Sequence, residues 1–523
     1  MTAQTAIDKP LLQAREWLEK NAYFLLALLA GYALIRSIVG AALRTFWFDE
    51  LCTLAVASRP NLRAVWDALA SAVDAHPIGF YVAERAARGV TANEHIASRL
   101  PAILAFPCTL ICIFVYVKKR SGNLAALIAS FLLLSTVLFE QYAREARAYS
   151  LVVACISLAL VCYQRASAPV WRVLLALSLM LAESFHHYSL FAFVPFGLAE
   201  AVVFFRTHRF RWGVWLAIVL GPLPLAFSWS LLLHVREHFG AHFFQHYGFR
   251  AIAATYGAYF LTDSAYGTAI VGLCFLATIF LTLRQEREDW GETAKPRDLQ
   301  LAEGTMVLGL LILPAIGWIM VTLMHAGMRD TYTISALLGV CLAVGMIVPY
   351  LRPLGVALFI VFLLLNVGFR EFKFWESARS LHLETPAPGL ETFLRDSGYS
   401  DSQLPIVVAN GMIYVPFAYY VHDPLWHRLY YLTDEEKEIR YQGADTFDRN
   451  VKLLNQYMPM QLQDFSEFAS THPVFLMYGE DPGYGNTWLA EYLSHEKYSV
   501  MAVGVDPTRR LFLVNMKKAA AGE

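Results

Sequence analysis

Charged residues are scarce in this sequence, and neither sign predominates. Asp, Glu, Lys and Arg make up 16% of the 523 residues, 57% are hydrophobic, and the formal net charge is -1. Such a composition is too apolar for an ordinary soluble protein of this length and predicts that most of the chain lies in lipid. The balanced charge gives no indication of a nucleic-acid partner.

Cysteine frameworks and nucleotide-binding glycine motifs are also missing. Seven cysteines occur, but only Cys52 lies outside an apolar segment and none follows Cys341. No disulfide pattern can therefore be read from their spacing. The sequence has neither a Walker-type nor a dinucleotide-binding glycine pattern, so a site for ATP or a nucleotide sugar is not indicated.

Long apolar segments are abundant. A helix of about 20 apolar residues spans the hydrocarbon core of a bilayer, and we count eleven segments near that length up to about residue 369. After that residue the charge rises, and short apolar runs such as LPIVVAN alternate with helical patterns. The sequence predicts an α-helical polytopic membrane domain over residues 1–369 and a soluble extracytoplasmic α/β domain over residues 370–523.

Basic connections between the spans predict their orientation, because Lys and Arg accumulate on the cytoplasmic side. Such connections follow the second, sixth and eighth apolar segments, at residues 118–120, 206–211 and 284–297. The loop after the first span would then face outside, as would the C-terminal domain. We expect an integral protein of a bacterial inner (plasma) membrane, with its active site and C-terminal domain facing the periplasm or exterior.

Ionisable residues collect at the outer ends of the predicted spans. Charges near a bilayer are costly unless they are paired or face a wet cavity, so several from different spans favour a functional site. The alternative for each is an interfacial charge that reaches water. The set comprises Asp49, Glu50, Asp74, His76, Glu84, Arg99, Glu140, Arg144, Glu145, Arg147, Glu183, His186, His187, Arg329 and Asp330.

Two amphipathic stretches in the first outer loop, residues 60–72 and 79–88, have the spacing of helices that lie on a membrane surface. They would roof a cavity and keep bulk water from Asp49 and Glu50. Asp49 could instead be the N-cap of the helix that follows it. His76 could likewise be a plain turn residue.

The stretch EQYAREARAYSL, residues 140–151, predicts a pair of guanidinium groups. On a helix, Glu140, Arg144 and Arg147 would lie on one face. Two guanidinium groups on one face suit phosphate, because each offers a planar fork of donors. The alternative is an internal ion-pair ladder with the neighbouring glutamates.

Two clusters leave a metal site open. Histidines four residues apart on a helix are a common metal-binding spacing, and this spacing occurs at His234, His238, His242 and His246. An interfacial amphipathic helix is the simpler account. Glu183 with His186 and His187 could also hold a metal or form a hydrogen-bonded turn. The sequence indicates no cofactor with certainty, and a divalent metal ion remains a candidate.

Several short motifs follow one another in an order that resembles the polytopic GT-C glycosyltransferases of the family 39 type, which include protein O-mannosyltransferases and the lipid A aminoarabinose transferase. The motifs are Asp49-Glu50, Asp74-Ala75-His76-Pro77 without the family's second proline, Arg99-Leu100-Pro101, Glu145-Ala146-Arg147-Ala148-Tyr149 and His187-Tyr188. Arg329 stands near the family's late Arg-Tyr pair, but two residues separate it from Tyr332.

The resemblance implies a GT-C fold and an inverting transfer of one sugar from a polyprenyl-phosphate donor to a protein, lipid or glycan acceptor. Asp49 would be the general base, with Glu50 beside it. The residues expected to hold the donor phosphate are Arg99, Arg144, Arg147 and Arg329. Those expected to shape the site or the acceptor position are Asp74, His76, Glu145, Tyr149, His187 and Tyr332. Membrane lipids are further expected partners.

A transporter or flippase of a lipid-linked substrate is the competing hypothesis. Transporters place ionisable groups near the middle of their spans, and Arg36 and Glu200 lie within predicted spans. Most other ionisable residues gather at one face of the membrane instead. That distribution favours the transferase.

Overall fold

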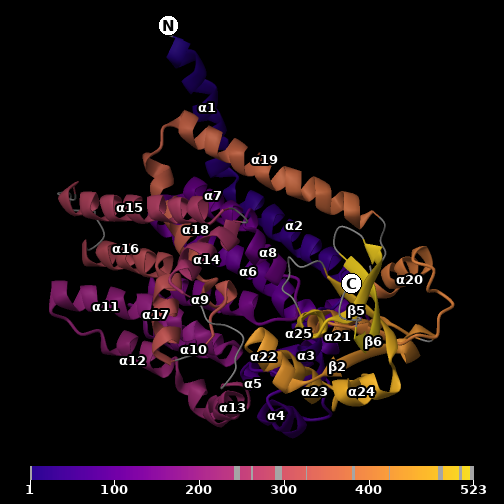
Figure 1. Cartoon of the computed structure of the whole chain (residues 1–523). Helices are drawn as coiled ribbons and strands as arrows, with labels where there is room; N and C mark the ends of the chain where they lie inside the picture. The colour runs from indigo at the N-terminus through magenta and orange to yellow at the C-terminus, as the bar shows by residue number, and fades with distance from the viewer. Residues whose placement is uncertain are drawn as a thin grey trace. The chain divides into compact units, whose positions relative to one another are not determined.

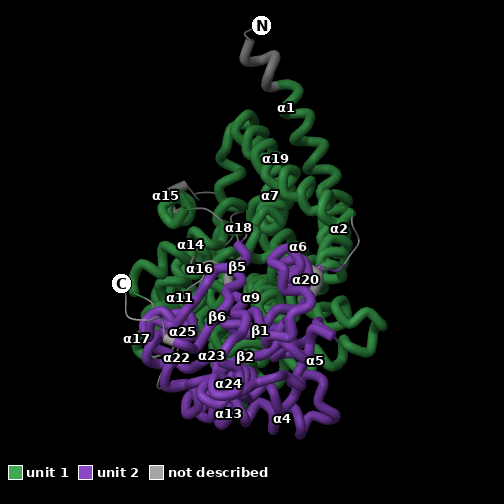
Figure 2. Tube along the Cα trace, turned by 45° about the vertical axis from the view of Figure 1, so that its right-hand side comes forward, with its two compact units in different colours: residues 1–43, 76–229, 247–382 green, residues 44–75, 230–246, 383–523 purple. Residues whose placement is uncertain are grey.

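A computed structural model describes residues 3–240, 248–260, 263–288, 297–324, 327–379, 383, 385–422, 424–480, 487–505 and 509–518. The chain divides into two compact units, coloured separately in Figure 2. Unit 1 comprises residues 1–43, 76–229 and 247–382, and unit 2 comprises residues 44–75, 230–246 and 383–523. Each unit therefore joins segments that are distant in the sequence. The expected domain boundary after residue 369 stays a prediction.

Unit 1 is helical. Its first half contains α1 (Ala3–Lys20), α2 (Ala22–Leu43), α5 (Ile78–Arg88), α6 (Glu94–Ser121), α7 (Asn123–Leu134), α8 (Val137–Tyr142), α9 (Tyr149–Tyr163), α10 (Pro169–Phe185), η1 (His187–Phe193), α11 (Val194–Thr207), α12 (Trp212–Leu220) and the start of α13 (Leu223–Phe239). Its second half contains α14 (Arg250–Phe260), α15 (Ser264–Glu288), α16 (Arg297–Leu311), α17 (Leu313–Met324), η2 (Asp330–Thr333), α18 (Ala336–Ile347), η3 (Val348–Tyr350) and α19 (Pro353–Ala378). In Figure 1, α15 and α16 run side by side.

The polytopic α-helical class is confirmed. Six described helical segments are long and apolar enough to cross a membrane: Ala22–Leu43, Glu94–Ser121, His187–Thr207, Trp212–Phe239, Ser264–Arg284 and Pro353–Ala378. A seventh is the pair α16 and α17, bent by 59° at their junction. Shorter apolar helices are α7, α9 and the pair α18 and η3. Each of the eleven segments counted in the sequence lies on one helix or on two consecutive ones.

Glycines permit the closest helix packing in unit 1. A Cβ added to Gly339 of α18 would lie 2.8 Å from the backbone nitrogen of Leu311 on α16. One added to Gly345 would lie 2.6 Å from a methyl carbon of Val117 on α6. Small residues at helix contacts are the usual way in which membrane helices approach closely. Gly339 and Gly345 therefore allow α18 to pack closely against α16 and α6.

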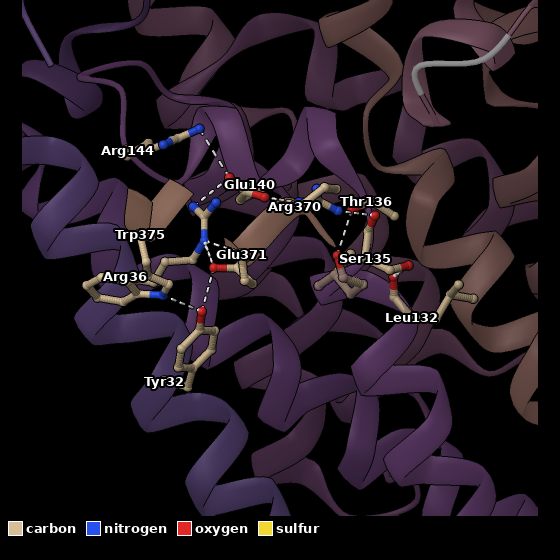
Figure 3. A network of polar contacts seen from close by, with 11 residues as sticks. Tyr32, Arg36, Leu132, Ser135, Thr136, Glu140, Arg144, Arg370, Glu371 and Trp375 are labelled. Atoms are coloured by element: carbon tan, nitrogen blue, oxygen red, sulfur yellow. Dashed lines mark hydrogen bonds and ion pairs between the residues drawn. The ribbon is translucent and has the colours of Figure 1, made fainter. Parts of the chain in front are cut away.

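A buried ion-pair network joins the first span of unit 1 to α8 and to the last span. Figure 3 shows Arg36 of α2 between two carboxylates. Its Nη1 lies 2.5 Å from Glu140 of α8, and its Nε lies 2.7 Å from Glu371 of α19. Arg370 also pairs with Glu140 and donates to the backbone oxygen of Ser135 at 2.5 Å. The charge of Arg36 within its span is thus balanced by partners on two other helices.

Glu200, the other charge within a span, has partners of the same kind. Tyr163 of α9 donates a hydrogen bond to the Glu200 carboxylate at 2.7 Å. The Nε of Arg211 donates to the same carboxylate at 3.0 Å. Buried charges in membrane proteins require such pairing. Both mid-span charges of the sequence therefore belong to structural ion pairs.

Unit 2 contains a mixed six-stranded sheet in the order β3-β2-β1-β4-β6-β5. Its strands are β1 (Ile406–Val408), β2 (Leu429–Thr433), β3 (Leu462–Asp464), β4 (Val474–Glu480), β5 (Tyr498–Val505) and β6 (Arg509–Lys518). The first four pair in parallel and the last two add antiparallel. Its helices are α20 (Pro386–Asp396), α21 (Gly411–Tyr420), η4 (Leu425–Arg428), α22 (Glu435–Gln442), α23 (Thr446–Leu454), α24 (Phe465–Thr471) and α25 (Trp488–His495). The expected C-terminal α/β fold is confirmed.

The first outer loop contributes to both units. Unit 2 includes α3 (Phe48–Ala57) and α4 (Leu62–Ala70), while α5 belongs to unit 1. The two amphipathic stretches of this loop are helical, as expected. Asn61 caps α4 by accepting a hydrogen bond from the Ala64 N–H at 2.9 Å. Their expected position on a membrane surface stays a prediction.

The ion-pair network predicts a large loss of stability when one carboxylate is removed. Glu140→Ala leaves three guanidinium groups without their shared partner, and breaking a buried pair costs about 3–5 kcal/mol. We expect a clear fall in the thermal unfolding temperature of the purified protein in detergent. Glu16→Ala on the exposed face of α1 is the matched control. Equal unfolding temperatures for the two variants would contradict the structural role of the network.

Candidate functional site

The acidic pair lies in the first turn of α3 in unit 2. Trp47 is the N-cap residue, with φ -100° and ψ 175°. The Glu50 carboxylate, which is fully buried, accepts a hydrogen bond from the Trp47 N–H at 3.3 Å. Glu50 thus satisfies one of the backbone donors that the start of a helix leaves open. The alternative in which Asp49 is the N-cap is wrong, and Asp49 is half-buried one residue before this contact.

A third expected carboxylate, Asp74, lies next to α3. The Thr53 hydroxyl is 3.1 Å from the backbone oxygen of Asp49 and 3.3 Å from a carboxylate oxygen of Asp74. Asp74 also accepts a hydrogen bond from the Ala75 N–H at 2.8 Å. The positive end of a helix dipole favours carboxylates near a first turn. Unit 2 therefore gathers Asp49, Glu50 and Asp74 around the start of one helix.

Unit 1 contains a cluster of five rings: His76, Tyr149, His186, Tyr188 and Tyr332. The His186 ring lies 4.9 Å from that of His76, 5.3 Å from that of Tyr149 and 5.3 Å from that of Tyr332. Tyr188 stacks on Tyr332 at 4.3 Å. These residues come from the starts of α9 and η1, the end of α10, the approach to α5, and η2. The structure thus brings together three of the predicted site residues, His76, Tyr149 and Tyr332.

His186, and not the neighbouring His187, contributes its ring to this cluster. His187, the residue expected from the His-Tyr motif, pairs instead with Glu183 one helical turn earlier, at 2.7 Å. His186 ends α10 in an extended conformation, and its side chain accepts a hydrogen bond from the Tyr188 N–H at 3.2 Å. Two adjacent histidines give no sequence signal for which one faces the tyrosines.

The predicted helical face of Glu140, Arg144 and Arg147 is wrong. α8 ends at Tyr142 and α9 begins at Tyr149, and the Arg147 N–H donates to the Glu145 backbone oxygen at 2.8 Å in the turn between them. Arg144 pairs with Glu140 at 3.1 Å, which confirms that part of the ion-pair ladder.

Glu145 and Arg147 share the turn before α9. Both side chains are buried, and Glu145 accepts a hydrogen bond from the Gln141 amide at 3.0 Å. Arg147 lies two residues before Tyr149, a member of the ring cluster. Their predicted roles in the site stay predictions.

The two remaining arginines have different surroundings. Arg99 is fully buried on α6, and its Nη1 donates to the backbone oxygen of Ala41 at 2.6 Å. That oxygen belongs to the last turn of α2, whose carbonyls have no partner within the helix. Arg329 is half-buried, and its backbone oxygen accepts the N–H of Tyr332 at 3.0 Å. Arg329 therefore precedes a residue of the ring cluster by less than one turn, and both phosphate roles stay predictions.

The two candidate metal sites of the sequence stay predictions. Among the described residues, no group of three or more His, Cys, Asp or Glu side chains is placed to hold a metal ion. His234 bonds to the backbone oxygen of Ser230 at 2.6 Å. His242 and His246 lie outside the described residues.

The buried carboxylates of Glu438 on α22 and Asp448 on α23 were not anticipated from the sequence. Glu438 of α22 accepts the N–H groups of Phe447 and Asp448 at 3.3 and 3.2 Å. Asp448 in turn accepts the Tyr431 hydroxyl at 2.7 Å and the Asp434 N–H at 2.7 Å. Burial, assisted by the neighbouring Asp448, raises the pKa of Glu438 to about 8, and burial raises the pKa of Asp448 to about 6. The stretch EEKEIR gives only the signal of a charged surface helix.

Neither a protein-family model nor a curated protein matches the sequence. Among solved structures, the chain is similar to ArnT from Cupriavidus metallidurans bound to undecaprenyl phosphate, with a TM-score of 0.48 and 12% identity over 93% of this chain and 97% of the other. It is also similar to ArnT from that organism in the apo state, with a TM-score of 0.40 and 13% identity over 96% and 98%. Because both TM-scores lie below 0.5, this likeness supports no conclusion about substrates, and family 39 membership stays a prediction.

Because the pKa values of Glu438 on α22 and Asp448 on α23 are raised, we predict that unit 2 loses stability as pH rises. Their folded pKa values exceed those of the unfolded chain, so their contribution is fully present below about pH 4 and is lost as pH rises through about 6 and about 8. Each group changes the stability by at most about 1.4 kcal/mol per pH unit. We expect the unfolding temperature to fall between pH 5.5 and 8.5.

Glu438→Gln, which keeps a hydrogen-bond acceptor, should reduce that fall. Thermal unfolding of the purified protein and of the variant at several pH values checks this. An unchanged pH dependence in the variant would show that Glu438 is not responsible.

Proposed function

We propose that this protein is an inverting glycosyltransferase that moves one sugar from a polyprenyl-phosphate donor to an acceptor hydroxyl or amine. We place the reaction at the periplasmic face of a bacterial inner membrane, following the distribution of basic connections. The acceptor would belong to a protein, a lipid or a glycan. The observation that carries the proposal is the acidic first turn of α3, where Asp49 and Glu50 have different surroundings.

In this proposal Asp49 is the general base. Glu50 is buried and accepts the Trp47 N–H, whereas Asp49 is half-buried. Asp49 would accept the proton of the acceptor as its oxygen or nitrogen attacks the anomeric carbon. The bond from that carbon to the phosphate oxygen breaks in the same step, and the polyprenyl phosphate leaves with the electron pair. A single displacement inverts the anomeric configuration.

The leaving phosphate requires charge stabilisation more than a proton. We assign this role to Arg147 and Arg329, which lie in the turns next to Tyr149 and Tyr332 of the ring cluster. Guanidinium groups form strong, charge-assisted hydrogen bonds to phosphate oxygens. Arg99 and Arg144 lie further along the chain from Tyr149 and Tyr332, and we keep them as secondary candidates.

The ion pairs of unit 1 weaken the transporter hypothesis. Its main support in the sequence was the presence of Arg36 and Glu200 within spans. Arg36 is paired with Glu140 and Glu371, and Glu200 is paired with Arg211. Charges held in such pairs stabilise helix packing and need no transported substrate to explain them.

The proposal predicts that Asp49→Asn abolishes most turnover. A carboxamide keeps the shape of the side chain but cannot accept the proton, so we expect a loss of about 10²- to 10⁴-fold. Asp67→Asn on the exposed face of the neighbouring α4 is the matched control and should retain the parent rate. The measurement is consumption of polyprenyl-phosphate sugars, beginning with undecaprenyl-phosphate sugars, by the purified protein.

Two results would contradict the proposal. One is a rate for Asp49→Asn equal to that of Asp67→Asn. The other is retention of the donor's anomeric configuration in the product, measured by NMR. Passage of lipid-linked substrates across proteoliposomes at the same rate in the parent and in Asp49→Asn, without consumption of any donor, would favour transport.

A further inference from the structure

The start of α3 is held in place by the C-terminal domain within unit 2. The backbone N–H of Phe46, two residues before the helix, donates to the Tyr420 hydroxyl at 2.7 Å. Tyr420 is the last residue of α21. The Phe48 ring meets the Phe447 ring of α23 edge-on at 6.4 Å. These two contacts flank the first turn, in which Asp49 and Glu50 lie.

Further contacts continue along α3 and α4. The Cys52 thiol lies 3.7 Å from the Asn450 side-chain oxygen on α23. Beyond α3, the Arg59 guanidinium lies over the Tyr457 ring at 5.0 Å, and the Ser71 hydroxyl is 3.0 Å from the Tyr457 hydroxyl. The segment after the first span is therefore bound to the C-terminal domain at both ends.

We propose that Tyr420 is a positioning residue for the Asp49-Glu50 pair, and that one role of the C-terminal domain is to fix the first turn of α3 in its reactive orientation. This inference rests on the proposed transferase function. It assigns to the domain a role in the chemical step of the reaction. A recognition role would affect acceptor binding instead.

The physical basis is the bond to the backbone of Phe46. Phe46 is buried, so its N–H must have a partner, and the Tyr420 hydroxyl supplies it. This bond fixes the path along which the chain enters α3, and with it the direction of the Asp49 side chain three residues later. A displacement of about 1 Å in a reacting group can reduce a rate by about 10²-fold. Loss of one supporting bond should have a smaller effect of the same kind.

The matched test compares Tyr420→Phe with Tyr414→Phe. Both residues lie on α21, and both variants lose one hydroxyl and keep the ring. The Tyr414 hydroxyl bonds to the backbone oxygen and N–H of Gln461, at 2.9 and 2.8 Å, away from α3. Tyr414→Phe therefore measures the general effect on the domain of losing the hydrogen bonds of a tyrosine hydroxyl.

We expect Tyr420→Phe to lower kcat about tenfold while the KM for the polyprenyl-phosphate sugar is unchanged. Tyr414→Phe should keep kcat near the parent value, although its unfolding temperature falls at least as much. Hydrogen exchange gives a readout independent of turnover: residues 45–52 should exchange faster in Tyr420→Phe and at the parent rate in Tyr414→Phe.

A double variant tests whether Tyr420 acts through Asp49. If it does, Tyr420→Phe has no further effect on the residual rate of Asp49→Asn, so the two losses are not additive. Additive losses, an equal kcat for the two tyrosine variants, or unchanged exchange of residues 45–52 would each overturn the inference.

The two proposals fail in different ways. If Asp49→Asn is inactive and Tyr420→Phe matches the parent in kcat, only the positioning role is wrong. If Asp49→Asn matches the parent, the assignment of Asp49 as general base is wrong and the positioning role falls with it.

Discussion

An isolated charge within the apolar interior of a membrane protein costs at least about 2.5–3.5 kcal/mol, and unit 1 avoids this cost by pairing. Arg36 links α2 to α8 and α19 through Glu140 and Glu371. These ion pairs join helices that are far apart in the sequence. The same requirement explains why Arg99 lies against an open carbonyl at the end of α2. Arg36 and Glu200, the two charges that favoured a transporter in the sequence, therefore form ion pairs within unit 1.

The candidate chemistry is divided between two differently built parts. The carboxylates lie on a short helix that packs within the α/β unit, where Tyr420 and Phe447 hold its first turn. The buried Arg147 lies in the turn before α9 of unit 1, and the rings of the cluster lie at or near the ends of helices of that unit. Short turns place polar groups at the ends of apolar helices without exposing backbone donors to lipid. We therefore assign phosphate binding to Arg147 and Arg329 of unit 1 and proton acceptance to Asp49 of unit 2.

Periodicity and composition predicted the apolar helices and the presence of a C-terminal α/β domain. The apolar segments became helices, and LPIVVAN contains β1. The spacing of residues along the chain did not predict where helices are interrupted or which of two adjacent side chains faces a cluster. The helix expected through Arg144 is interrupted at residues 143–148, and nothing in the sequence distinguishes His186 from His187. Contacts such as Phe46 with Tyr420 join positions 374 residues apart, so no local pattern could reveal them.

The most direct test of this division of roles is the binding of undecaprenyl phosphate, without a sugar, to the protein in lipid nanodiscs. The account predicts that Arg147→Gln and Arg329→Gln each weaken binding about tenfold, since a charge-assisted bond to phosphate contributes about 1.5–3 kcal/mol. Asp49→Asn and the exposed Arg209→Gln should bind as the parent does. Equal binding by all four variants, or weaker binding only in Asp49→Asn, would contradict it.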